Sequence, residues 1–237
     1  MSFLKQFATP LQIATTVLLY SQFSVLGGIA ATPGLGIVCF AFARSDQWPV
    51  IFRLFILGVL LFLAYFSYTI CVLFVVGFFR FISRARAPLG KFPLYSMTTL
   101  RWVSYNALIL LVRFTCMHFI RGTPFLVLFH RMMGMRMGQR VQLNTSVIAD
   151  SNLIEIGDDT VIGGDATVIA HSVERGVLIT EPVRIGKRVT VGLMAVIMPG
   201  CEIGDDAVIA ANAVLKKGTK IGTKEVWGGV PAQRIIK

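Results

Sequence analysis

The chain has 237 residues, of which 55% are apolar and only 15% are charged, and its mean hydropathy is +0.72. This composition excludes an intrinsically disordered chain, and four cysteines in so long a chain exclude a small disulfide scaffold. It also differs from that of a fully soluble domain, in which about 25% of the residues are charged.

The net charge of +11 is concentrated in the first part of the chain. Residues 1–140 contain thirteen Lys and Arg but a single acid, Asp46, whereas residues 141–237 contain ten basic and eleven acidic residues. Because the basic excess coincides with the apolar half, it indicates membrane-topology signals rather than nucleic-acid binding. We therefore expect a lipid bilayer, and no nucleic acid, among the partners.

Two long uncharged segments predict transmembrane helices. The first, from Phe7 to Ala43, has about 37 residues, whereas one span needs roughly 20 and the apolar part of a cleaved signal peptide only about 7–15. Thr32-Pro33-Gly34 predicts a break, with one span over 9–31 and a short apolar or re-entrant helix to Phe42. The second segment runs from Leu54 to Phe79.

The basic residues after the second segment predict the topology. They are Arg80, Arg84, Arg86, Lys91 and Arg101, and such residues are typical of the cytoplasmic side. With two spans, the N-terminus and the rest of the chain lie on that side as well. The sequence therefore predicts an integral membrane protein whose C-terminal half faces the cytoplasm.

Residues 102–120 decide whether this topology holds. The segment is apolar but contains Arg113 and His118, which favours a helix lying at the interface over a third span. A third span would carry the C-terminal half across the membrane. We expect a transmembrane anchor over 1–90, interfacial connecting helices over 91–138 and a separate domain over 139–237.

The C-terminal half is built from six-residue repeats. From Ile185 the chain divides without a slip into IGKRVT, VGLMAV, IMPGCE, IGDDAV, IAANAV, LKKGTK, IGTKEV and WGGVPA, and two earlier blocks start at Ile156 and Ile162. One block cannot bury its own apolar side chain, but stacked coils bury a continuous column of them. The period predicts a left-handed parallel β-helix with three blocks per coil.

The repeat is interrupted over residues 168–184. We expect this segment to be a loop, and it contains His171, the single histidine of the repeat half. Loops on a rigid scaffold are common places for functional residues.

The repeat half resembles the hexapeptide-repeat acyltransferases, such as the galactoside and maltose O-acetyltransferases. The matching features extend over about 140–236 and are Asn144 before Ile156-Gly157-Asp158, His171 in the interrupting segment, Pro182 before Ile185-Gly186, Pro199-Gly200 before Ile203-Gly204, and Gly229-Val230-Pro231-Ala232. The His-x-x-Glu segment and the terminal Trp-Gly-Gly-Val-Pro-Ala also resemble membrane-linked terminal modules of some nonribosomal peptide synthetases.

The resemblance implies an enzyme that moves an acetyl or other acyl group from acyl-coenzyme A to a hydroxyl. Because the soluble sugar acetyltransferases have no counterpart of the anchor, their acceptor is not carried over. Tethering favours a membrane-associated acceptor instead, such as a glycan, a lipid-linked sugar or a lipophilic metabolite. The family also forms trimers, which implies a homotrimer with the coenzyme A lysines and His171 of different subunits facing one cleft.

The resemblance assigns the catalytic base to His171, because imidazole titrates near neutral pH. A carboxylate normally orients such a histidine, and Glu174 is the nearest in sequence, with Asp165 and Asp150 as alternatives. Asn144 is expected to hold the acceptor or the oxyanion, and Asp150 is the second candidate for binding the acceptor.

Coenzyme A needs cations for its phosphates and small residues for its pantetheine arm. The candidates are Gly192, Ala211, Lys216, Lys217, Trp227 and Arg234. Trp227 replaces an aliphatic residue and either packs on the adenine or closes the last coil. The basic residues have a solvated edge as their alternative interpretation.

Three other functions are compatible with parts of the sequence. A γ-type carbonic anhydrase needs three metal-binding histidines, but His118 and His130 precede the repeat, so we expect no metal. A non-catalytic membrane scaffold or binding module explains the coil but not the histidine segment. An amine-acylating or peptide-forming transferase would use the same base with an amine acceptor.

Overall fold

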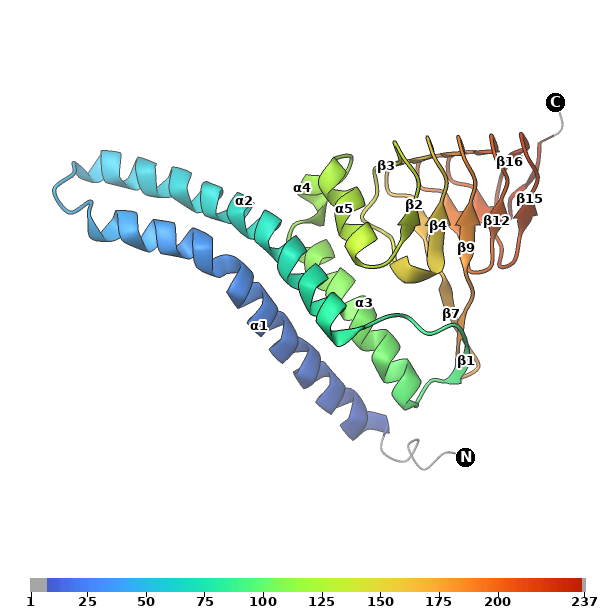
Figure 1. Cartoon of the computed structure of the whole chain (residues 1–237), viewed down its shortest axis with the longest axis horizontal. Helices are drawn as coiled ribbons and strands as arrows, with labels where there is room; N and C mark the ends of the chain where they lie inside the picture. The colour runs from blue at the N-terminus through green and yellow to red at the C-terminus, as the bar shows by residue number, and fades with distance from the viewer. Residues whose placement is uncertain (1–7, 236–237) are drawn as a thin grey trace.

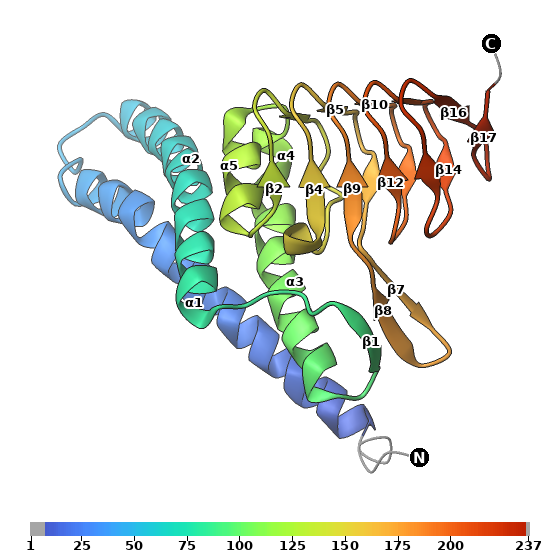
Figure 2. The same ribbon diagram turned by 45° about the vertical axis from the view of Figure 1, so that its right-hand side comes forward.

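The computed structural model describes the backbone of residues 8–235 and the side chains of residues 12–235. A helical N-terminal half stands against one end of a β-helix formed by the C-terminal half (Figures 1 and 2). The predicted fold class, α-helices followed by a left-handed parallel β-helix of hexapeptide repeats, is confirmed.

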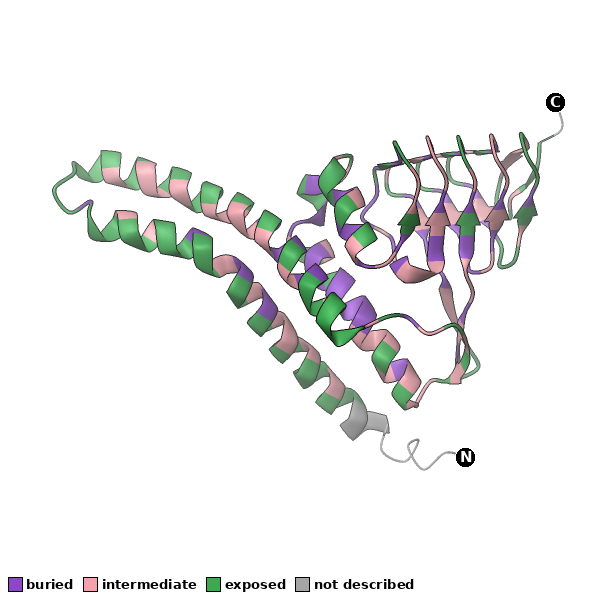
Figure 3. Cartoon of the chain, in the orientation of Figure 1, coloured by how far each residue is buried: buried purple, intermediate pink, exposed green. Residues whose placement is uncertain are grey.

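Two long helices, α1 (Ala8–Ala43) and α2 (Val50–Ser83), form an antiparallel hairpin. Their apolar side chains are largely exposed, and much of the outer surface of the hairpin is green in Figure 3. Exposed apolar surface of this extent is typical of contact with lipid or another protein. Two stretches of the described chain, Gln12–Ala43 and Val50–Ser83, are long and apolar enough to cross a membrane.

The predicted break at Thr32-Pro33-Gly34 is wrong, because α1 continues through it to Ala43. Proline removes one backbone donor but does not have to end a helix whose neighbours hold it. The hydroxyl of Thr32 donates to the carbonyl of Gly28 at 2.9 Å, one turn back. A Cβ at Gly34 would lie 2.8 Å from the backbone of Ala64, so α2 packs closely against this turn.

Three further helices, α3 (Met97–Thr115), α4 (Met117–Ile120) and α5 (Pro124–Met132), lie between the hairpin and the β-helix (Figure 2). Ser96 caps α3, since its hydroxyl accepts a hydrogen bond from the backbone of Thr99 at 3.2 Å. The side chains of Tyr105, Leu108 and Val112 are fully buried, so α3 is packed on protein. It is not one of the two helices of the described chain that could span a membrane.

The β-helix has three parallel sheets, one for each face of the coil. They are β3–β5–β10–β13–β16, β6–β11–β14 and β2–β4–β9–β12–β15, and β17 (Gln233–Arg234) closes the first with an antiparallel pairing. The strand bounds are β2 Arg136–Met137, β3 Gln142–Leu143, β4 Ile154–Ile156, β5 Val161–Ile162, β6 Thr167–Val168, β9 Val183–Ile185, β10 Thr190–Val191, β11 Val196–Ile197, β12 Glu202–Ile203, β13 Val208–Ile209, β14 Val214–Leu215, β15 Lys220–Ile221 and β16 Val226–Gly228. In the uninterrupted coils, partners such as Val196 and Val214 are 18 residues apart, which is three blocks per coil.

The first position of each block faces the interior. The residues at this position from Ile185 to Ile221 are at most 5% exposed. The fourth position takes a left-handed backbone, as at Arg188, Met194 and Asp206. One position thus supplies the core and another the sharp turn, which is why the period is six.

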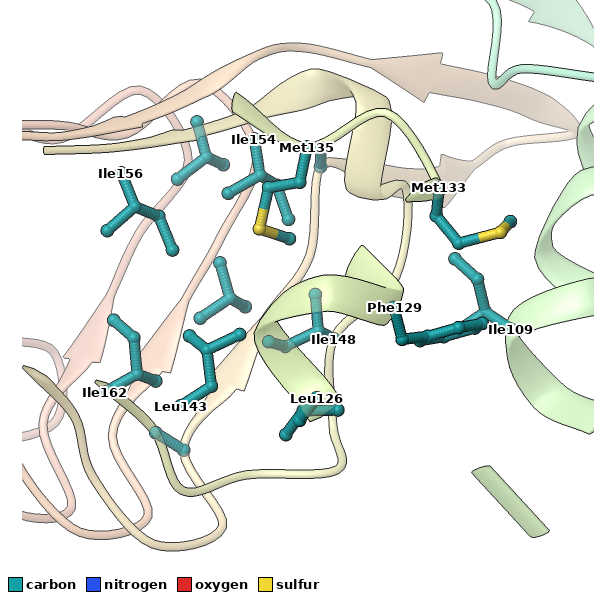
Figure 4. Close-up of a cluster of buried hydrophobic side chains, with 14 of the residues drawn as sticks. Ile109, Leu126, Phe129, Met133, Met135, Leu143, Ile148, Ile154, Ile156 and Ile162 are labelled. Carbon is teal, nitrogen blue, oxygen red and sulfur yellow. The ribbon is translucent and has the colours of Figure 1, made fainter. Parts of the chain in front are cut away.

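Helix α5 closes the end of the β-helix that faces the helical half. In Figure 4, Leu126 of α5 lies beside Leu143 and Ile148 of the first coil, and Ile162 continues the same column, whereas Phe129 points toward Ile109 of α3. Terminal coils of solenoids need such a cap because their last apolar layer has no next repeat to cover it. The apolar core is therefore continuous from the helices into the coil.

The interrupting segment 168–184 is not the predicted loop. It forms a hairpin of β7 (His171–Glu174) and β8 (Val177–Thr180), and β1 (Gly90–Pro93) adds a third antiparallel strand to it. Figure 2 shows this small sheet projecting from the side of the β-helix. The segment after α2 therefore begins with a strand on the hairpin rather than with an interfacial helix.

Candidate active site

A buried carboxylate, that of Asp150, forms the centre of the candidate site. Asp150 precedes the short 3₁₀ turn η2 (Ser151–Leu153), and its backbone is left-handed, with φ of 56°. Its side chain is fully buried. Burying a charge without partners is very costly, so the hydrogen bonds of this carboxylate determine what it does.

Two of the donors to Asp150 come from helix α3. Trp102 Nε1 donates to Oδ1 at 2.7 Å, and Asn106 Nδ2 donates to the same oxygen at 2.8 Å. The backbone N–H of Asp150 returns a bond to Asn106 Oδ1 at 3.0 Å. Trp102 and Asn106 are four residues apart, which places them on one face of the helix. Helix α3 thus fixes the carboxylate of the repeat domain.

The other oxygen of Asp150 faces the β7–β8 hairpin. Its Oδ2 accepts from the backbone of Ala170 at 3.2 Å and lies 2.5 Å from Nδ1 of His171. Because the carboxylate is surrounded by donors, we assign the proton of this contact to Nδ1. The lone pair of the neutral ring is then on Nε2, which has no hydrogen-bond partner among the described residues.

The ring of His171 is held on a second side by Trp102. The two rings meet edge to face, with centroids 4.8 Å apart and an interplanar angle of 67°. The side chain of His171 is 24% exposed, so Nε2 is available to a substrate while the ring is fixed. An oriented, partly exposed imidazole backed by a carboxylate is the arrangement that a general base needs.

The carboxylate expected beside His171 was that of Glu174, but Glu174 forms an ion pair with Lys217 instead. His171 and Glu174 lie three residues apart on a strand, and such residues point to opposite faces. Asp165, the other alternative, pairs with Arg121 at 2.6 Å. Asp150 is the carboxylate that the fold brings to His171, so its geometry fits orienting the base better than binding the acceptor.

Asn144 lies on the first coil with an exposed side chain. Its backbone continues the ladder, donating to Ile162 at 3.0 Å, and its amide lies near Gly122 and Gly164. Gly192 and Ala211 stack on one corner of successive coils, where a Cβ at Gly192 would collide with the backbone at Ala211. This glycine therefore has a structural role, because it lets the next coil pack closely.

The candidate coenzyme A cations lie in different surroundings. Lys216 is exposed, whereas Lys217 is paired with Glu174 of the hairpin. In the last coil, Glu225 accepts a hydrogen bond from Trp227 Nε1 at 2.9 Å and forms an ion pair with Arg234 at 3.2 Å. The indole hydrogen bond, more than the guanidinium, keeps the pKa of Glu225 below its usual range. Trp227 is aligned with Ile209 of the coil before, as a residue that closes the last coil would be.

Trp102 and Asn106 are not among the site residues predicted from the sequence. Both lie in the segment that was expected to lie flat on the membrane. No nearby residue in the sequence indicates that they contact a distant aspartate. The available signal was the polar Asn106 in an apolar run, one helical turn after Trp102. His130 is not part of this site, since it is fully buried and its Nδ1 lies 2.9 Å from Ser151 Oγ. The described residues contain no group of three or more side chains suited to a metal.

Comparison with known proteins gives a family and several relatives. The profile of the bacterial transferase hexapeptide family (six repeats) matches residues 182–217. The putative acetyltransferase YvoF of Bacillus subtilis (strain 168) is 31% identical over 130 residues, which cover 52% of this chain and 74% of that protein. The galactoside O-acetyltransferase of Escherichia coli (strain K12) is 32% identical over 114 residues, 42% of this chain and 55% of that enzyme.

A third relative is much longer than this chain. The delta-poly-L-ornithine synthetase of Acinetobacter baumannii (strain AB307-0294) is 28% identical over 116 residues, which are 49% of this chain but only 9% of the synthetase.

Proposed function

This chain belongs to the bacterial transferase hexapeptide family, and we propose that it transfers an acyl group, most simply acetyl, from acyl-coenzyme A to a hydroxyl of a membrane-associated acceptor. The contact between His171 and Asp150 carries the proposal. It gives a hexapeptide coil the oriented base that a non-catalytic scaffold would not need.

The chemistry assigned to His171 is general base catalysis. Its Nε2 takes the proton of the acceptor hydroxyl as the oxygen attacks the thioester carbonyl. The tetrahedral intermediate collapses, the carbon–sulfur bond breaks, and the imidazolium returns the proton to the leaving thiolate. Asp150 stabilises the imidazolium and fixes its tautomer, and Asn144 is proposed to stabilise the acceptor or the oxyanion.

We assign the donor to the outer surface of the last coils. Lys216, Lys217 and Arg234 would neutralise the phosphates of coenzyme A, and Trp227 would pack on the adenine. Gly192 and Ala211 would expose the backbone groups that meet the pantetheine arm. Because Lys217 is paired with Glu174, a phosphate that binds Lys217 would have to displace this carboxylate or share the lysine with it.

The acceptor is assigned to the membrane because of the helical hairpin. Tethering the coil at the bilayer raises its local concentration relative to a lipid-linked sugar or other membrane-held hydroxyl. We place the catalytic domain on the cytoplasmic side, where acyl-coenzyme A is present. As a homotrimer, the protein would form its clefts between neighbouring coils, and a monodisperse monomer in mild detergent would contradict this.

A second candidate function is supported by one observation. The similarity to delta-poly-L-ornithine synthetase covers 49% of this chain, and that enzyme is named for a polymer of an amino acid. The alternative is therefore transfer to an amine, with the same base and an amine in place of the hydroxyl.

The decisive experiment measures acetyl-coenzyme A turnover by the purified protein in detergent, with and without a membrane lipid extract. We expect turnover that is lost in His171→Ala and retained in His118→Ala, which removes an exposed histidine of α4. Products are then treated with hydroxylamine, which cleaves esters but spares amides. Binding of acetyl-coenzyme A without turnover would favour a binding module, and failure to bind it would contradict the proposed donor.

A further inference from the structure

A cavity of 1160 Å³ lies beside α3, next to the end of α2. It is lined by the start of α1, by the last residue of α2 and the segment 84–89 that follows it, by the first two turns of α3, and by Asn152 and Leu153 of the repeat half. The lining residues of α3 include Arg101 and Ser104, which point to a different side of the helix from Trp102 and Asn106. The cavity is therefore separate from the surroundings of His171.

The cavity is positively charged. Arg84, Arg86 and Arg101 line it, and all three are exposed. None of them has a carboxylate partner among the described residues. Asp46 is the one acid in residues 1–140, and it pairs with Arg53 at 3.1 Å at the other end of the hairpin. Three unneutralised guanidinium groups in one cavity favour an anionic ligand, and phosphate fits the donors of arginine.

Part of the remaining wall is apolar. Ala14 and Leu18 of α1 face it, together with Leu89, Met97 and Leu100 from the other side. The cavity also lies at the level where the apolar part of α2 ends in Arg80 and Arg84. A ligand there would meet arginines at one end and apolar side chains along the other, as the headgroup and upper chain of a lipid would.

We propose that this cavity binds an anionic membrane lipid, with its phosphate on Arg84, Arg86 and Arg101 and its chain against α1 and α3. The proposal rests on the membrane placement given above, but not on the chemistry at His171. The lipid would hold the start of α1 and the segment 84–89 against α3. That segment is already tied to the repeat domain, because Ala87 and Asn152 exchange two hydrogen bonds of 2.9 and 3.0 Å.

The test is native mass spectrometry of the full chain released from nanodiscs of phosphatidylcholine that contain phosphatidylglycerol. We expect retained phosphatidylglycerol, and at least about tenfold weaker retention in Arg84→Gln/Arg101→Gln. The matched control is Arg44→Gln/Arg175→Gln. It removes one charge from the connection between α1 and α2 and one from the β7–β8 turn, and it should retain the lipid. Leu100→Trp keeps all charges but puts a bulkier side chain on the apolar wall against which the lipid chain would lie, and it should also weaken lipid retention while it elutes and melts like the wild type.

Three results would overturn the proposal. The first is equal retention of phosphatidylcholine and phosphatidylglycerol by the wild type. The second is equal loss of lipid in the Arg44→Gln/Arg175→Gln control. The third is thermal stabilisation by inorganic phosphate alone that equals that by phosphatidylglycerol, which would identify a free phosphate as the ligand. None of these readouts requires acyl transfer, so failure of the proposed enzymatic function would leave them interpretable.

Discussion

Asp150 and His171 illustrate how two residues acquire a role from partners far away in the sequence. The aspartate receives its bonds from Trp102 and Asn106, more than forty positions earlier, and from the hairpin about twenty positions later. Such a network is cooperative, and a buried carboxylate that loses its hydrogen-bond donors destabilises the fold. Substitutions at these two side chains therefore give the most direct test of the proposed catalysis.

We predict that Asp150→Asn lowers kcat by about 10²–10⁴-fold, because an amide does not stabilise an imidazolium and favours the wrong tautomer of His171. Glu174→Gln should leave kcat within a few-fold, since Glu174 pairs with Lys217 and not with the base. Steady-state kinetics with acyl-coenzyme A measure both, and the KM of Glu174→Gln reports on whether Lys217 meets the phosphates. A larger fall in kcat for Glu174→Gln than for Asp150→Asn would reverse the assignment.

His130 should make stability depend on pH. Burial lowers the pKa of His130 to about 3, whereas an unfolded chain titrates near 6.5. Below about pH 6.5 the unfolded chain takes up a proton that the folded chain does not, so stability falls as the pH decreases from 6.5 toward 3. At pH 5 the loss is about 2 kcal/mol.

The measurement is the midpoint of thermal unfolding in detergent at pH 7 and pH 5. His130→Gln should reduce the difference between the two pH values, although it lowers stability at pH 7. His118→Gln removes an exposed histidine and should keep the wild-type difference. An unchanged pH dependence in His130→Gln would place its origin elsewhere.

At the scale of elements, the packing of α1 on α2 decides whether α1 is one helix or two. Because Gly34 lets the backbone of Ala64 approach, the second helix supports the turn that contains Pro33. Packing likewise determines the surroundings of helix α3. Its apolar side around Tyr105 and Leu108 is covered by protein and does not lie at a membrane interface. Neither outcome is visible in the helix's own sequence.

Gly34→Leu should separate the hairpin, because its Cβ would lie 2.8 Å from the backbone of Ala64. We expect a loss of about 1–3 kcal/mol in stability, typical of overpacking, seen as a lower unfolding midpoint. Gly36→Leu is the matched control, since a Cβ there meets nothing within 4 Å. Both changes gain the same helix propensity, so the difference between them reports on packing. Equal midpoints would show that α1 does not depend on α2 at this turn.

At the scale of the whole molecule, the two candidate spans and the charges at their ends fix the proposed orientation. Reporter fusions after residues 90 and 237 should both read cytoplasmic, and one after residue 47, between α1 and α2, should read the opposite side. The reason is the positive-inside rule, applied to the basic residues that follow α2. A non-cytoplasmic signal at residue 237 would separate the coil from cytosolic acyl-coenzyme A and contradict the proposed donor.

Much of this protein could be predicted from its sequence, where the determinant is local. Every block of the coil contains one core residue and one turn position. The six-residue period therefore predicts the solenoid without knowledge of any long-range contact. Uncharged segments likewise predict the two long helices, because the cost of placing a charge in lipid acts on each residue separately. The choice of His171 as the proposed base followed from its position in a motif.

Packing between separate elements accounts for the features that no local pattern predicts. It made Asp150, rather than Glu174, the partner of His171, because the hairpin turns neighbouring strand residues to opposite faces. It continued α1 through Pro33, since packing against α2 holds that turn together. It also brought Trp102 and Asn106 to Asp150, and it gathered Arg84, Arg86 and Arg101 around one cavity. Such contacts depend on how separate elements pack, and no local pattern encodes the distance between two segments that the chain itself keeps far apart.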